Sequence, residues 1–164
     1  MQSTRPPWWR GTRGEWYVAI QIVLFALILL GPRTLPGLPA WSAAASGIAR
    51  GGGVLLMVSG ALLLLASAFR LGSNLTPLPY PKAHATLVQS GPYRVVRHPI
   101  YAGVILLAYG WAFFVRGWLT LVCASALLIL LEVKSTREEQ WLSERFPGYA
   151  EYQRRVRKLI PFVH

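Results

Sequence analysis

The sequence predicts an all-α integral membrane protein with about four transmembrane helices. Hydrophobic residues make up 54% of the 164 residues and charged residues only 14%, a balance typical of membrane proteins. Four apolar stretches stand out, at residues 16–31, 51–69, 100–115 and 118–131. Basic residues also gather on the segments that four crossings would bring to one side of the bilayer. The length suits one domain over residues 1–164.

The four stretches differ in length, and the difference bears on how they cross. About 20 residues span the hydrocarbon core of a bilayer. The first two stretches reach this length with their flanks, whereas the last two are short, which favours tilt, local thinning or burial against neighbours. Only Arg116 and Gly117 separate the last two, so we expect a tight antiparallel hairpin.

The net charge of +11 is unevenly placed along the chain. Four crossings put 14 of the 17 Lys and Arg residues on the face of the two termini and three on the other face, namely Arg33, Arg50 and Arg116. By the positive-inside rule, this predicts an inner or plasma membrane protein with both termini in the cytoplasm. The same placement argues against a nucleic-acid partner and favours the lipid bilayer, whose anionic headgroups attract basic tails.

Features that suggest other classes have simpler explanations. The basic leader before the first stretch resembles a signal peptide, but prolines bound the apolar run far from the small residues 43–45, so we expect an uncleaved span. The single cysteine, Cys123, excludes an intrachain disulfide, and the three histidines are scattered, so no metal site is predicted. We interpret the small residues at 51–53, with Gly103 and Gly110, as sites of close helix packing.

The polar segments fall around the last two spans. Residues 1–69 hold the leader, two spans and a loop over 32–50, and residues 70–162 hold the other two spans and these polar segments. The prolines of segment 70–99 exclude a single helix, and its apolar content predicts an ordered cytosolic cap. Pro99 suits the first position of the third helix, with His98 as N-cap. Further helices are expected at 132–146 and about 149–159, separated by Pro147-Gly148.

Charged and aromatic side chains converge at the predicted cytosolic ends of the last two spans. They comprise cations, carboxylates and tyrosine rings: Arg94, Arg97, His98, Glu138, Glu139, Tyr93, Tyr101, Tyr149 and Tyr152. Arginine forks pair with carboxylate or phosphate, and rings stack on a base or face a cation. The mixture suits a zwitterionic ligand with an anionic end, hydroxyls and an aromatic base. No GxGxxG motif follows a strand, so a Rossmann cofactor domain is excluded.

Two ordered motifs carry a family resemblance. The run Gly91-Pro92-Tyr93-Arg94-x-x-Arg97-His98-Pro99-x-Tyr101-x-Gly103 resembles the signature of the isoprenylcysteine carboxyl methyltransferase family and its phospholipid methyltransferase relatives. The downstream run Glu138-Glu139-x-x-Leu142, then Phe146-x-Gly148-Tyr149-x-x-Tyr152 and Ile160-Pro161, is similar to that family's second block. The similarity covers about residues 70–162.

The resemblance implies a membrane methyltransferase that uses S-adenosylmethionine, releases S-adenosylhomocysteine and lacks a Rossmann domain. It implies a cytosolic cofactor pocket formed by Leu87, Gly91, Tyr93, His98, Tyr101, Glu139 and Tyr149, with Arg97 and Glu138 as the catalytic pair that completes or orients it. Within this set, Arg97 or His98 would hold the methionine carboxylate, and Glu139 the ribose or the amino group.

The resemblance leaves the methyl acceptor open. A prenylated protein C-terminus, a phospholipid amine, an isoprenoid acid and a small thiol or amine all remain, and the short flanking segments favour a small or lipophilic acceptor. Sterol-reductase-like membrane proteins share an Arg-His-Pro-x-Tyr segment, so an NAD(P)H-dependent reductase is an alternative, and NADPH binding would identify it. A non-enzymatic small membrane protein is a further alternative, but it would need polar residues within the spans.

Overall fold

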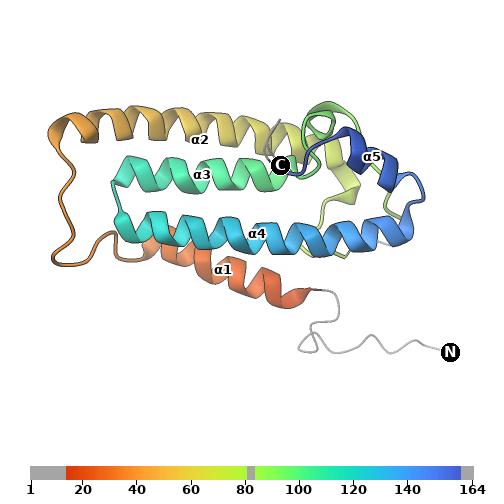
Figure 1. The fold of residues 1–164 in the computed structure, drawn as a ribbon, viewed down its shortest axis with the longest axis horizontal. Coiled ribbons are helices and arrows are strands. Elements are labelled where there is room, and N and C mark those ends of the chain that lie inside the picture. The colour runs from red at the N-terminus through yellow and green to blue at the C-terminus, as the bar shows by residue number, and fades with distance from the viewer. Residues whose placement is uncertain (1–13, 81–83, 160–164) are drawn as a thin grey trace.

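The computed structural model describes residues 14–80 and 84–159. Within these ranges the chain folds as four long helices with a smaller helical cap, which confirms the all-α prediction (Figure 1). The elements in order are α1 (Glu15–Leu30), α2 (Ala43–Leu71), η2 (Gly72–Asn74), η3 (Gly91–Arg94), α3 (Pro99–Val115), α4 (Trp118–Arg145) and α5 (Tyr149–Arg155). The Ile160-Pro161 pair and the leader cations Arg5, Arg10 and Arg13 lie outside the described residues.

The long helices run alternately up and down the bundle (Figure 1). As a result, the start of α1, the end of α2, the start of α3 and the end of α4 lie at one end, together with α5 and the segment between α2 and α3. We call this the site end. The α1–α2 connection and the α3–α4 turn lie at the other end, called the far end. The alternation therefore brings the two motif-bearing segments together.

Two of the described helices are long and apolar enough to cross a membrane. They are the 32-residue stretch Ala43–Asn74 and the 28-residue α4. The protein buries only 11% and 33% of their most apolar windows, so apolar side chains such as Leu55 and Leu62 face outward. Outward apolar surface of this extent is typical of membrane contact. At 1.5 Å per residue, the 16 residues of α1 and 17 of α3 extend about 24–26 Å, slightly less than the hydrocarbon core.

Two predicted boundaries were wrong. α2 begins at Ala43 rather than within a loop that lasts to residue 50, because the Ser42 side chain accepts a hydrogen bond from the Ala45 backbone N–H (3.2 Å) and alanine favours helix. The helix expected at 132–146 is present as the continuation of the fourth apolar stretch, and together they form the single helix α4. α5 ends at Arg155, before residue 159, because the chain then becomes extended and Arg157 pairs with Val96.

α2 and α3 approach each other through two pairs of glycines. A β-carbon on Gly60 would lie 2.7 Å from the Gly103 carbonyl oxygen, and one on Gly53 would lie 2.7 Å from that of Gly110. Small residues allow such backbone contact between membrane helices. The predicted packing role is therefore confirmed for Gly53, Gly103 and Gly110. It was wrong for residues 51 and 52, where a β-carbon would meet nothing within 4 Å.

We expect Gly60→Ala to destabilise the fold by about 1–3 kcal/mol, because the added methyl group forces two helix backbones apart. Gly52→Ala is the matched control: it lies on the same helix, has open space, and should be neutral or stabilising because alanine is the better helix former. Thermal unfolding of the detergent-purified proteins measures both. Equal midpoints for the two variants would contradict the close glycine packing.

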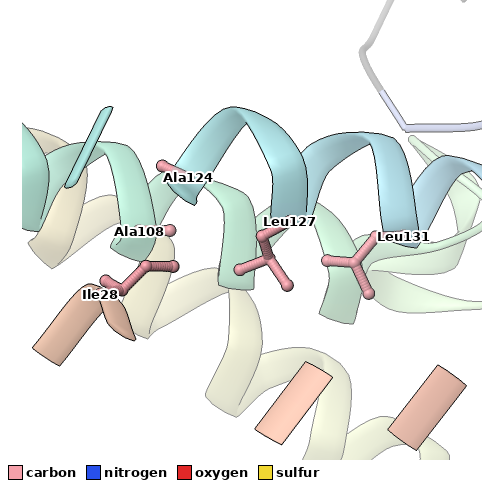
Figure 2. Close-up of a cluster of buried hydrophobic side chains, with 5 residues drawn as sticks. All are labelled: Ile28, Ala108, Ala124, Leu127 and Leu131. Atoms are coloured by element: carbon pink, nitrogen blue, oxygen red, sulfur yellow. The ribbon is translucent and has the colours of Figure 1, made fainter. Parts of the chain in front are cut away.

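A cluster of buried apolar side chains packs α1, α3 and α4 against one another. Ile28 of α1, Ala108 of α3, and Ala124, Leu127 and Leu131 of α4 form it (Figure 2). Leu127 and Leu131 are fully buried. Tyr101, near the start of α3, packs against the same cluster. The apolar core therefore fixes one side of a residue whose hydroxyl lies in the candidate site.

Candidate functional site

The two motif-bearing segments are tied together through their backbones. The Arg97 N–H donates to the Arg157 carbonyl (2.8 Å), and the His98 N–H donates to the Lys158 carbonyl (3.1 Å). The Tyr152 hydroxyl donates to the Tyr93 carbonyl (2.6 Å). Since these bonds span about 60 residues of sequence, they place η3 and the start of α3 directly against α5. The two motifs therefore contribute side chains to the same site.

Glu139 of α4 is the centre of a buried polar cluster. Its Oε1 accepts hydrogen bonds from Arg97 Nε (2.7 Å) and from His98 Nε2 (3.0 Å). Its Oε2 accepts from Arg97 Nη2 (3.3 Å) and from Gln153 Nε2 (3.0 Å). The Glu139 side chain is 11% exposed and that of Arg97 is 12% exposed. The carboxylate is therefore saturated by protein donors and fixes both cations of the first motif.

Most of the Arg97 guanidinium is used inside the protein. Besides the fork to Glu139, its Nη1 donates to the carbonyl of Gln153 (3.1 Å) and to the carbonyl of Val156. Of its five N–H groups, one on Nη2 has no hydrogen bond to the described residues. Arg97 is thus a positioning residue with a single remaining donor for a ligand.

Glu138, the neighbour of Glu139, lies in a different environment. Its Oε2 accepts from the Tyr101 hydroxyl (2.7 Å) and lies 3.9 Å from His98 Nδ1. The imidazole of His98 stacks on the Tyr101 ring, with centroids 5.4 Å apart and planes 5° from parallel. The Glu138 side chain is 26% exposed, so part of this carboxylate is open to a ligand. His98 is the N-cap residue of α3 and precedes its first residue, Pro99, as predicted. Its imidazole ring makes a hydrogen bond to Glu139 and none to the helix backbone.

A cavity of about 130 Å³ lies at the site end, in front of these groups. Seven of the nine predicted site residues are on its wall: Leu87, Tyr93, Arg97, His98, Tyr101, Glu138 and Tyr149. Gly91 and Glu139 are not. Gly91 has a positive φ of 64° and opens η3 beside the Arg70 side chain, so its role is in the turn. The exposed Arg94 is also absent from the wall.

The Tyr149 hydroxyl is the buried polar atom of this wall that has no hydrogen-bond partner in the described protein. Tyr149 is 1% exposed. Burial raises the pKa of its hydroxyl well above the ordinary tyrosine value, so the group stays protonated at neutral pH and can donate. An orphaned buried hydroxyl costs free energy unless a ligand pairs with it. Its position on the cavity wall therefore indicates a ligand-binding role.

The predicted cofactor-binding and catalytic residues did not include several residues of the wall. Among them are the polar Asn74 and Thr86, the apolar Leu142 and Phe146, and Tyr152, which was expected in the same cluster but was not assigned to the pocket. Asn74 makes three hydrogen bonds of 3.2 Å to Thr86, and Arg70 Nε donates a hydrogen bond to Ser90 Oγ (2.7 Å). Together these hydrogen bonds attach the segment between α2 and α3 to the end of α2. A signal for Tyr152, Leu142 and Phe146 was present, because all three belong to the second motif.

A group of three or more His, Cys, Asp or Glu side chains that could hold a metal ion is absent from residues 14–80 and 84–159. The polar cluster consists of arginine, histidine and carboxylate side chains that hydrogen-bond to one another. Its interactions are charge-assisted hydrogen bonds.

Fold and site together define an apolar helical bundle with a buried polar cluster and a cavity at one end. The chain belongs to the phospholipid methyltransferase family, whose model matches residues 48–148. The match includes both η3 and the two adjacent glutamates. It confirms the family expected from the motifs.

One curated relative adds a local similarity. The chain is 35% identical over 77 residues to the cobalt-zinc-cadmium resistance protein CzcN of Cupriavidus metallidurans. The aligned region is 46% of this chain and 36% of the relative. The chain thus matches little more than a third of that protein's length.

Proposed function

We propose that this protein transfers a methyl group from S-adenosylmethionine to a lipophilic or small acceptor, a carboxylate, amine or thiol, at the boundary between membrane and cytosol. The observation that carries the proposal is the cavity in which the open Glu138 carboxylate and the unpartnered Tyr149 hydroxyl share one wall. The family match supports methyl transfer over the reductase alternative.

We further propose that all four long helices cross the membrane, with both termini on the cytoplasmic side. The alternating helices would put the cavity and most of the basic residues on the same, cytoplasmic face (Figure 1). Outward apolar side chains on α1 and α2, such as Leu29 and Leu62, support contact with lipid. A water-soluble cofactor would then enter from the cytosol.

The wall residues fit S-adenosylmethionine. The Tyr149 hydroxyl gains a partner when a polar ligand binds, and the partly open Glu138 carboxylate suits an amino group or ribose hydroxyls. The free Nη2 N–H of Arg97 suits the methionine carboxylate. The enclosed volume is smaller than the roughly 300–1,000 Å³ of typical small-molecule sites, so a nucleoside-sized ligand requires the wall side chains to move apart.

The chain's own contribution to the reaction is binding and orientation. The cofactor supplies, when bound, an electrophilic methyl group on a sulfonium centre. Glu139 holds Arg97 and His98 in place, and we assign the ligand-facing carboxylate to Glu138 instead of Glu139, because Glu139 is saturated. Leu87, Leu142 and Phe146 give the cavity apolar walls that exclude water. An acceptor that arrives deprotonated needs mainly alignment, which can lower a barrier by about 7–11 kcal/mol.

Calorimetric titration of the detergent-purified protein with S-adenosylhomocysteine, with NADPH in a parallel run, tests this function. We expect S-adenosylhomocysteine alone to bind. Binding of NADPH alone would overturn the methyltransferase proposal and favour the reductase. A methylation assay with radiolabelled S-adenosylmethionine and a membrane lipid extract would then identify the acceptor class.

Tyr149→Phe tests the orphaned hydroxyl. We expect this variant to be as stable as the unaltered protein or slightly more so, because it removes an unsatisfied buried polar group. S-adenosylhomocysteine binding should weaken by about 2- to 10-fold, the effect of one lost hydrogen bond of about 0.5–1.5 kcal/mol. The matched control is Tyr109→Phe, which removes a hydroxyl that bonds Ser125 outside the cavity and should leave binding unchanged. Unweakened binding in Tyr149→Phe would remove Tyr149 from the ligand site.

A further inference from the structure

Three arginines from separate segments line one hollow at the far end of the bundle, away from the catalytic cavity. They are Arg33 of the α1–α2 connection, Arg50 of α2 and Arg116 of the α3–α4 turn. The aromatic rings of Trp111 and Phe114 complete most of the wall of this hollow of about 520 Å³. These are the same three basic residues that the sequence assigns to the face opposite the termini. The fold has therefore brought together every cation available on that face.

Among the described residues, no carboxylate pairs with any of the three cations. The six acidic residues of the chain are Glu15, Glu132, Glu138, Glu139, Glu144 and Glu151, on α1's first turn, the second half of α4 and α5. All of these segments lie toward the site end (Figure 1). An ion pair to Arg33, Arg50 or Arg116 is absent from the described residues. Within the described residues, this end of the molecule therefore presents positive charge without a counter-ion.

Arg116 is the most constrained of the three. Its Nε is buried and has no hydrogen-bond partner in the described protein, while its Nη1 makes one long contact of 3.4 Å to Ser46 Oγ. Its backbone adopts φ 55°, a conformation that favours glycine. A cation suits the C-cap position of α3 because of the helix dipole. The helix dipole explains why a cation is favoured at Arg116. It does not explain why Arg33 and Arg50, from other segments, line the same hollow.

Hydrogen bonds link the two connections at the far end, next to the hollow. The Arg33 carbonyl accepts from the Leu119 N–H (3.0 Å), and the Pro39 carbonyl accepts from Trp118 Nε1 (2.9 Å). These bonds fasten the α1–α2 connection to the α3–α4 turn. The Arg33 guanidinium lies over the Trp111 ring, 5.4 Å from its centroid. Arg33 is thus held by the fold through its backbone carbonyl and its ring contact.

We propose that this hollow binds the phosphate group of an anionic phospholipid in the leaflet at the far end. Arginine forks recognise phosphate, and basic pockets between membrane helices bind anionic headgroups. A lipid, as opposed to a free phosphate, is indicated by the apolar surface that adjoins the arginines. Leu30, three residues before Arg33, is 86% exposed, and Ile48, two residues before Arg50, is 77% exposed, so an acyl chain has apolar side chains to follow. The proposal rests on the membrane placement given above and is separate from the methyl acceptor site.

The test is thermal unfolding of the full chain in a neutral detergent, with palmitoyl-oleoyl phosphatidylglycerol, palmitoyl-oleoyl phosphatidylcholine or inorganic phosphate added. We expect phosphatidylglycerol to raise the unfolding midpoint and the other two to have little effect. In Arg33→Gln/Arg116→Gln, the phosphatidylglycerol concentration needed for half the shift should rise by about tenfold or more. Arg154→Gln removes one positive charge from α5 at the site end and should respond like the unaltered protein, and it is the matched control for the single variant Arg50→Gln.

Other outcomes overturn the proposal. An equal shift with phosphatidylcholine would show that charge is not recognised, and a full shift with inorganic phosphate would make the ligand a soluble anion. An unchanged response in the double variant would move the lipid site elsewhere. If the double variant fails to fold, Arg50→Gln, whose side chain is exposed, gives the same comparison with a smaller expected change. S-adenosylhomocysteine binding should persist in all of these variants, so a failure here is distinguishable from a failure of the catalytic proposal.

Discussion

Glu139→Gln should destabilise the protein by about 3–5 kcal/mol, because it removes the charge that pairs with a buried arginine. In the native protein the carboxylate receives four hydrogen bonds, two from Arg97 and one each from His98 and Gln153. A glutamine has one acceptor oxygen, and its NH₂ group would face a donor. The thermal unfolding midpoint in detergent measures the loss, and S-adenosylhomocysteine binding should fall with it.

The adjacent residue provides a matched control for stability. Glu138→Gln removes the same charge one position away on the same helix, but its amide oxygen can still accept the hydrogen bond from Tyr101. Glu138 is also more exposed than Glu139, so its charge is better solvated. We expect a stability change of less than about 1 kcal/mol. Similar destabilisation in the two variants would contradict the central role of Glu139 in the cluster.

Glu138→Gln should instead reduce ligand binding, and this is the second large effect. A charge-assisted hydrogen bond contributes about 1.5–3 kcal/mol, so we expect S-adenosylhomocysteine to bind about 10- to 100-fold more weakly to a protein that is otherwise folded. Calorimetry measures the dissociation constant, and the unfolding midpoint verifies the fold. Methyl transfer from S-adenosylmethionine should fall at least as far.

Two results would contradict the assignment to Glu138. Unchanged affinity in Glu138→Gln would show that the ligand does not use this carboxylate. A loss of affinity that is fully explained by unfolding would make Glu138 structural. Glu144→Gln is the activity control, since Glu144 is an exposed carboxylate on the same helix outside the cavity wall and its removal should leave binding unchanged.

The two glutamates show where sequence reasoning about the site ends. Both motifs were visible in the sequence, and most of the predicted residues do meet around one cavity. Adjacent residues on a helix point about 100° apart, so Glu138 and Glu139 must face different surroundings. Which of them faces the cavity depends on how α4 is rotated against the Arg97-His98 segment. That rotation is set by packing between helices that are distant in sequence.

Helix boundaries show a related division. The long apolar runs and the position of Pro99 were sufficient to predict where α1 and α3 lie. The beginning of α2 was missed because a proline-rich, small-residue segment is typical of a loop, although the Ser42 cap starts a helix there. The end of α5 was missed because Val156 and Arg157 leave helical geometry to pair with the segment before α3. A tertiary contact overrode the helical spacing of their side chains.

The sequence by itself determined the class of protein. Its apolar runs, its motifs and its uneven charge are local properties, and local properties suffice to predict helices, a family and a preferred orientation. Only the tertiary structure decided which groups are free to act. It saturated Glu139, left the Tyr149 hydroxyl without a partner, and gathered Arg33, Arg50 and Arg116 into one hollow. These outcomes depend on hydrogen bonds and burial between segments far apart in the chain, which no local pattern records.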